Sequence, residues 1–267
     1  MRGVLIFAHS SETIELAREC ARRVHLYLKV KVCLVTSEYF EPDEDFDFIR
    51  SDPAIGEHSH WLAYEMTPFD ETIILDYRYM IFSSQTPLRH LFIDSHSIFG
   101  TSLESDFKIG LNANTLMGQD AVGFINPATI PSVCASVIFF KRSVFVENIF
   151  LTALAVVENW KFFSKQYQST AITPDHVFAI ALHLNQGSRA PIFRDFFGLP
   201  FKIKVIRDVE QDKLRALTDS EAFIVFDGID CKRSIVLTGE DLLFRDIENL
   251  LNMVRKFNAR EELKDAE

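Results

Sequence analysis

An aspartate at the end of an apolar strand is the clearest candidate for chemistry in this sequence. Residues 71–76 read ETIILD and predict a buried strand that closes on a carboxylate. Ligands of a parallel sheet collect at the carboxyl ends of its strands, so Asp76 is the first predicted site residue. Asp76 could equally cap the turn that follows the strand, and the spacing alone does not separate these two roles.

Other residue types that can do chemistry are weaker candidates. His58 and His60 would suit a lid, yet histidines in a loop are more often solvated than ligating. Cys134 has no identifiable base beside it and is interpreted as a core residue. The acids of residues 37–53 are interpreted as an exposed loop and not as a metal site.

The elements that must position Asp76 begin at the amino end of the chain. Residues 3–7 predict a strand, residues 11–28 a helix with Ser11 as its N-cap, and residues 30–35 a second strand. This order is one β-α-β unit, which predicts a parallel sheet. The later predicted elements are a strand at 79–82, a short helix from Pro87, loops or a small insertion at 94–123, a strand at 133–140, a buried helix from about 144 to 167, and a helix that starts near Asp175 behind Thr173-Pro174.

The carboxyl-terminal third is predicted to be a small annex of the same domain. Its expected elements are short strands at 201–205, 222–226 and 234–237 and an amphipathic helix at 241–257. The predicted organisation is therefore an α/β core at 1–190, an α+β annex at 191–257 and a frayed tail at 258–267.

Composition restricts the partners of the chain. Its 267 residues carry a net charge of -10, which repels phosphate backbones and anionic membranes. A DNA partner would need a local basic patch, and the candidates are Lys202, Lys204 and Arg207, or Lys141 with Arg142, all of which could be ordinary surface residues. Four cysteines without a CxxC pair indicate reduced thiols. The most apolar stretch, residues 149–157, is too short to cross a bilayer and no signal peptide is evident, so we expect a soluble cytoplasmic protein.

Four segments resemble those of GT-A-fold nucleotide-sugar glycosyltransferases, and in particular glycosyltransferase-like proteins of tailed phages. They are GVLIFAHSSETIELA at 3–17, VCLVTSE at 32–38, TPFDETIILDYRYMIFSS at 67–84 and PDHVFAIALHL at 174–184. The resemblance covers roughly residues 3–187. It implies a GT-A-like, Rossmann-like mixed sheet flanked by helices.

The resemblance also implies roles for particular residues. In that family the carboxylates of a DxD motif hold a divalent cation that bridges the donor diphosphate. Asp76 would be the first motif carboxylate, and Asp175 would face the sugar or the acceptor. The loop after the first strand would line the nucleotide pocket through Ala8, His9 and Ser10.

The sequence departs from the family pattern at the second motif carboxylate. Arg78 stands there, in the sequence Asp76-Tyr77-Arg78. An arginine does not ligate a cation, but it can bind a diphosphate through a forked pair of hydrogen bonds. The family's carboxyl-terminal histidine ligand also has no counterpart in SIVLTGED at 234–241. Both departures predict either that Arg78 replaces the metal in donor binding, or that the fold serves another donor or no catalysis.

Three functions follow from this resemblance. The first is group transfer from a nucleotide-diphosphate sugar, in which Arg78 stabilises the leaving group and Asp175 or Asp76 positions or deprotonates the acceptor hydroxyl. The second is transfer to a hydroxymethylated or otherwise activated pyrimidine of phage DNA, in the host cytoplasm. The third is a non-catalytic protein that binds nucleotides on the same fold. The oligomeric state is left open.

Overall fold

The computed structural model describes ten stretches of the chain, and the structural statements below concern these residues. They are 1–56, 58–81, 88–93, 99–102, 134–163, 172–185, 206–207, 223–227, 234–238 and 241–243.

A six-stranded mixed sheet forms the centre of the described fold, with the order β3-β2-β1-β4-β7-β6. Its strands are β1 (Arg2–Phe7), β2 (Lys31–Thr36), β3 (Phe48–Ser51), β4 (Glu71–Leu75), β6 (Phe99–Ser102) and β7 (Cys134–Lys141). β3, β2, β1 and β4 run parallel, whereas β7 is antiparallel to both β4 and β6. The predicted mixed α/β sheet is therefore confirmed.

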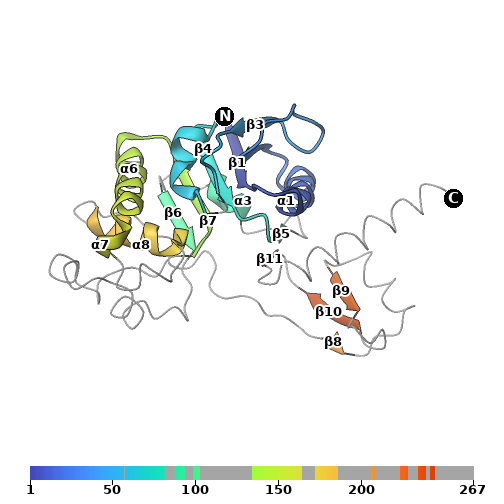
Figure 1. Cartoon of the computed structure of the whole chain (residues 1–267). Coiled ribbons are helices and arrows are strands. Elements are labelled where there is room, and N and C mark those ends of the chain that lie inside the picture. Colours follow the sequence, from blue (N-terminus) through green and yellow to red (C-terminus); the bar gives the residue numbers. More distant parts are fainter. Residues whose placement is uncertain are drawn as a thin grey trace.

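Helices cover both faces of this sheet, which explains why its central strands are apolar along their whole length (Figure 1). One face carries α1 (Ser11–Arg23), a π-helical turn (Val24–Leu28), β5 (Tyr79–Ile81) and α3 (Leu88–Ile93). The other carries a 3-10 turn (His60–Leu62), α2 (Ala63–Met66), α6 (Val144–Glu158), α7 (Trp160–Phe163) and α8 (Pro174–Leu184).

The N-cap of α1 lies one residue earlier than predicted, and the helix begins at Ser11. Ser10, not Ser11, is the N-cap, and its hydroxyl accepts from the Thr13 backbone N–H at 3.3 Å. The Thr13 hydroxyl in turn accepts from the Ser10 backbone N–H at 2.9 Å, which completes a capping box. The prediction of Ser11 was wrong because the reciprocal partner of the cap is Thr13, and not an acid of the first turn.

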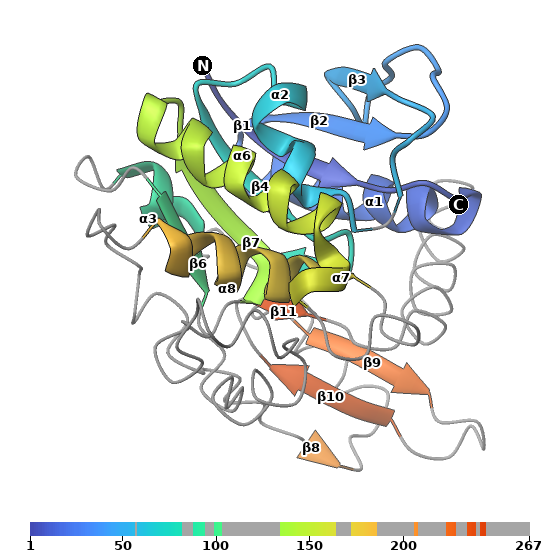
Figure 2. The same ribbon diagram turned by 60° about the vertical axis from the view of Figure 1, so that its left-hand side comes forward.

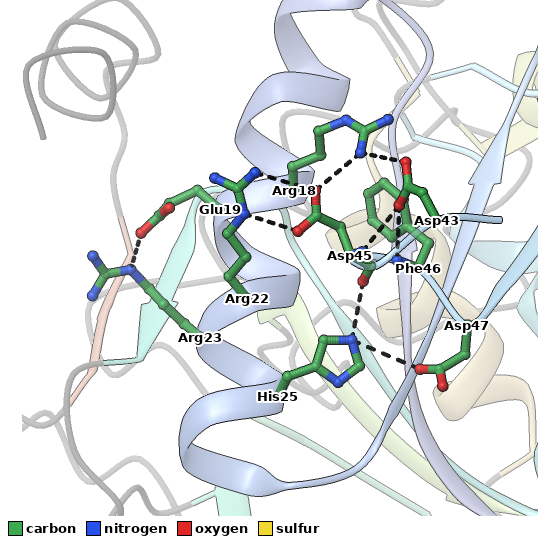
Figure 3. A network of polar contacts seen from close by, with 9 residues as sticks. All are labelled: Arg18, Glu19, Arg22, Arg23, His25, Asp43, Asp45, Phe46 and Asp47. Atoms are coloured by element: carbon green, nitrogen blue, oxygen red, sulfur yellow. Dashed lines mark hydrogen bonds and ion pairs between the residues drawn. The ribbon is translucent and has the colours of Figure 1, made fainter. Parts of the chain in front are cut away.

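The prediction that residues 37–53 form an exposed loop holds for most of 37–47 but is wrong for the strand and for two buried residues ahead of it, Asp45 and Phe46. Residues 48–51 are strand β3, at the edge of the sheet beside β2. Ahead of it, Asp45 is only 3% exposed and accepts hydrogen bonds from Arg18 at 2.9 Å and Arg22 at 2.8 Å. Figure 3 shows these acids turned toward the arginines of α1. Ion pairs with Arg18 and Arg22 of α1 therefore hold the acidic segment against the rest of the fold.

Two further helix predictions need correction. The helix from residue 144 ends at Glu158, and it is not buried all round, because Val144 is 75% and Leu151 56% exposed. Only one side of α6 packs on the sheet, through residues such as Ile149 and Phe150. Residues 241–243 form strand β11 (Asp241–Leu243), which pairs antiparallel with β5, and not the first turn of a helix.

A three-stranded antiparallel sheet of order β8-β10-β9 lies in the carboxyl-terminal third (Figure 2). Its strands are β8 (Ile206–Arg207), β9 (Phe223–Asp227) and β10 (Ser234–Thr238), so the strands predicted at 222–226 and 234–237 are confirmed. Strand β6 lies within 94–123, where loops or a small insertion were predicted, and the rest of that range lies outside the described residues. The predicted strand at 201–205 also lies outside them, and the domain boundaries stay a prediction.

Substituting Gly3 by alanine should destabilise the fold by about 1–3 kcal/mol, the usual cost of overpacking a core. A Cβ atom at Gly3 would lie 2.4 Å from ring carbons of Phe69, whose side chain is 1% exposed and has little room to move. Urea denaturation of Gly3→Ala measures the change. The control is Gly56→Ala, where the added Cβ meets only the Ser59 hydroxyl at 3.9 Å. Equal midpoints for both variants would contradict the prediction.

Candidate functional site

The carboxyl ends of β1 and β4 meet at one edge of the sheet. Asp76 follows the last residue of β4, and its backbone N–H donates to the Ser136 carbonyl of β7 at 2.9 Å. Leu5 of β1 pairs with Ile74 of β4, and continuing this register brings Phe7 level with Asp76. Phe7 and Ile74 both belong to the core layer that faces α6 and α8, and Asp76 is the next residue of that alternation.

The guanidinium of Arg78 binds both oxygens of the Asp76 carboxylate, and this pair of residues is called the fork below. The Arg78 Nε donates to Oδ1 at 2.8 Å and its Nη2 to Oδ2 at 2.5 Å, while the Arg78 backbone N–H donates to Oδ1 at 2.8 Å. The Asp76 side chain is 8% exposed and the Arg78 side chain 27% exposed. Both oxygens of Asp76 therefore serve to orient a guanidinium that keeps part of its surface toward solvent.

This fork does not suit a divalent cation. A metal needs carboxylate oxygens, yet both Asp76 oxygens accept from Arg78, whose positive charge would repel the ion. Among the residues that the structure describes, three or more His, Cys, Asp or Glu side chains are nowhere grouped as a metal would need. The chemistry of the fork fits an anion that shares the guanidinium with Asp76.

The third predicted site residue, Asp175, lies at the other side of the start of β7. It is the second residue of α8, which begins at Pro174 after the N-cap Thr173, as predicted. Its Oδ1 accepts from the Ala135 backbone N–H at 2.6 Å, one residue before the Ser136 carbonyl that binds Asp76. Two aspartates 99 positions apart in the sequence thus flank two consecutive residues of β7.

The predicted nucleotide loop follows β1 directly. Ala8 is fully buried and its N–H donates to the Val35 carbonyl at 3.0 Å, and Ser10 is engaged in capping α1. His9 is exposed, and its carbonyl accepts from the Ser37 hydroxyl at 3.3 Å. The loop therefore joins β1, β2 and α1, and His9 is the member of the three whose side chain faces solvent.

His60 was predicted to lie in a solvated loop or a lid, but the structure buries it. Its ring is 6% exposed and stacks on Phe7, with centroids 5.0 Å apart and planes 20° apart. Burial lowers the pKa of His60 to about 4; the charge of Asp76 opposes this shift and the charge of Arg78 adds to it. The short 3-10 turn His60–Leu62 packs against α6 and α8. The apolar residues after His60 could have indicated this burial.

One residue of the candidate basic patch at Lys141 and Arg142 has a structural role. Arg142 donates to the carbonyls of Thr67 at 2.7 Å and Phe69 at 3.2 Å, so it holds the turn ahead of β4. Lys202 and Lys204 lie outside the described residues, as does the side chain of Arg207.

Within the described stretches, the helices are all too short or too polar to cross a membrane.

Comparison with known proteins finds similarity in the path of the backbone and not in the sequence. No family model matches the sequence, and no curated protein matches it. Among solved structures, the galactosyltransferase LgtC in complex with donor and acceptor sugar analogues is 13% identical over 68% of this chain and 70% of its own, with a TM-score of 0.46. The apo glycosyltransferase GlyE of Streptococcus pneumoniae TIGR4 is 12% identical over 69% of this chain and 44% of its own, also with a TM-score of 0.46.

The bifunctional glycosyltransferase WbbM is more distant, with 10% identity over 58% of this chain and 34% of its own, and a TM-score of 0.39. At these TM-scores and identities the similarity does not indicate an activity, and a fold shared by many proteins does not fix function. The function of this chain must be argued from its own residues at the edge of the sheet.

Proposed function

We propose that this protein is a glycosyltransferase-like enzyme that binds a nucleotide-diphosphate sugar without a metal, through Arg78. The observation that carries the proposal is the fork between Arg78 and Asp76 at the carboxyl edge of the sheet. A guanidinium held in one orientation and partly exposed is suited to a diphosphate, because it offers fixed positive charge and directed N–H groups. The resemblance of the sequence around Asp76 to nucleotide-sugar enzymes supports the same donor class.

Arg78 acts on the step in which charge develops. The bond between the anomeric carbon of the sugar and the diphosphate oxygen breaks, and its electron pair leaves with the diphosphate. Arg78 stabilises that negative charge. An acceptor hydroxyl forms the new bond to the anomeric carbon and releases its proton.

The two aspartates take different parts in this proposal. Asp76 is a positioning residue, because its carboxylate is occupied by Arg78. The acceptor proton therefore goes to Asp175, which stands across the start of β7 and whose Oδ1 the Ala135 N–H holds in place.

Replacing Arg78 by alanine should weaken UDP binding at least tenfold, since a charge-assisted hydrogen bond contributes about 1.5–3 kcal/mol. Calorimetric titration with UDP in EDTA measures the dissociation constant. The matched control is Arg2→Ala, which removes an arginine whose Nε binds Glu71 at 2.9 Å at the opposite end of β1 and β4. UDP binding should survive EDTA and the control substitution. Absence of binding, loss of binding in EDTA, or an unchanged affinity in Arg78→Ala would each contradict the proposal.

The acceptor is a separate question. A hydroxymethylated pyrimidine of phage DNA is the acceptor that the sequence resemblance suggests, and the net charge of -10 works against it. Binding of modified DNA that falls as salt rises would support this acceptor, and affinity indifferent to salt would exclude it. A protein that binds UDP but releases none from UDP-sugars in the presence of acceptors would be the non-catalytic alternative.

A further inference from the structure

The buried imidazole of His60 has an unsatisfied nitrogen. Nδ1 has no hydrogen-bond partner among the described residues, although the side chain is almost fully buried. A buried polar atom without a partner costs about 1–3 kcal/mol, so native proteins keep few of them. An unsatisfied atom at the ligand-binding edge of a sheet is therefore a candidate contact for a ligand.

His60 lies at that edge. Its ring stacks on Phe7, the last residue of β1, which the register places level with Asp76 on the same face of the sheet. Arg78 binds the Asp76 carboxylate, so the fork lies at the same end of β1 and β4 as Phe7. The ring therefore lies at the end of the sheet that carries the fork, against Phe7, which directly precedes Ala8.

The protonation state of His60 restricts what it can bind. Burial keeps the ring neutral at neutral pH, with one nitrogen as donor and the other as acceptor. A neutral imidazole nitrogen binds phosphate more weakly than the charged guanidinium of Arg78 does. It suits a hydroxyl group, which can either donate or accept.

We propose that His60 binds a hydroxyl group of the nucleotide-sugar donor through Nδ1. This inference rests on the donor binding proposed above and assigns a ligand contact that lies outside the Asp76-Tyr77-Arg78 segment. The hydroxyl belongs either to the ribose of the nucleotide or to the transferred sugar. Both present the same chemistry, and UDP and UDP-glucose distinguish them as probes.

Three substitutions separate the nitrogen from the bulk of the ring. His60→Phe keeps an aromatic ring on Phe7 and removes both nitrogens. His60→Asn keeps a polar atom attached to Cγ, as Nδ1 is, whereas His60→Gln places its polar atoms one bond further out, nearer the position of Nε2. The control is His58→Phe, at a half-buried neighbour that meets His60 through the backbone, where the His60 N–H donates to the His58 carbonyl at 2.8 Å.

Dissociation constants for UDP and UDP-glucose, measured by calorimetry below the melting temperature of every variant, test the inference. His60→Phe should bind UDP-glucose about tenfold more weakly than the wild type, the loss expected of one buried hydrogen bond. His60→Asn should recover most of the affinity, and His60→Gln should not. An equal loss for UDP identifies the ribose, and a loss confined to UDP-glucose identifies the sugar.

Two results would overturn the inference while leaving the proposed function intact. One is wild-type affinity for both ligands in His60→Phe. The other is a loss in His60→Phe that His60→Asn fails to recover or that His58→Phe matches, because the ring would then act through packing alone. If the wild-type protein binds neither ligand, the proposed function and this inference are both wrong.

Discussion

Substituting Asp45 by asparagine should lower the free energy of unfolding by about 3 kcal/mol, near the lower end for breaking a buried ion pair. The Asp45 side chain is 4% exposed and accepts from Arg22 Nε at 2.8 Å and from Arg18 Nη1 at 2.9 Å. The two arginines are 47% and 31% exposed, so solvent screens part of the attraction and the larger values for fully buried pairs do not apply. In Asp45→Asn the carboxylate that serves both guanidinium groups is lost (Figure 3).

The matched control for this effect is Glu44→Gln. It removes the same charge one position away, from a side chain that is exposed. Urea denaturation of the two variants and the wild type at neutral pH gives the comparison. We expect the control within about 0.5 kcal/mol of the wild type, the usual range for surface substitutions. A difference between the two variants below 1 kcal/mol would show that the ion pairs of Asp45 contribute little to the fold.

The protein should become about 3 kcal/mol less stable as the pH falls from 6.5 to 4, because a pKa difference of one unit corresponds to about 1.4 kcal/mol. Burial lowers the pKa of His60 from 6.5 to about 4 in the folded protein. The unfolded chain therefore binds this proton first, so the stability contribution is complete above pH 6.5 and declines down to about pH 4.

His60→Phe tests the assignment of this pH dependence. The variant should keep nearly constant stability across the same range, apart from the contribution of His176, whose pKa is also lowered by burial and acts with the same sign. Protonation of Asp43 affects stability at lower pH than protonation of the histidines does. Burial raises its pKa, but hydrogen bonds from Arg18 and from the backbone N–H groups of Asp45 and Phe46 outweigh this, and the pKa lies below the ordinary 3.8.

The Asp43 contribution is therefore present above pH 3.8 and is lost only below it. Urea midpoints measured at half-unit intervals from pH 4 to pH 7.5 separate these effects. A wild-type midpoint that does not change between pH 6.5 and pH 4.5 would contradict the burial of a neutral His60.

Local patterns predicted the elements whose partners are close in sequence. The strand, helix and strand of residues 2–36 form one unit, and their continuous apolar runs and helical periodicity suffice to identify them. The start of α8 behind Thr173-Pro174 was predicted correctly for the same reason, since a cap and an N1 proline act within one turn.

Apart from the N-cap of α1, two clear errors arose from contacts with residues far away in the sequence. Asp43 and Asp45 look solvated in the sequence, but Arg18, 25 and 27 positions earlier, binds both. Residues 241–243 have a helical pattern, but they pair with β5 some 160 positions away. In each case a tertiary contact outweighed the local signal.

By itself, the sequence determined that Asp76 ends a buried strand of an α/β sheet, because apolar periodicity and caps act between near neighbours. Only the tertiary structure decided which side chains stand around Asp76. It placed Asp175 across the start of β7 and buried His60 against Phe7. Those contacts depend on strand order, register and packing between segments far apart in the chain, and spacing along the chain does not encode them.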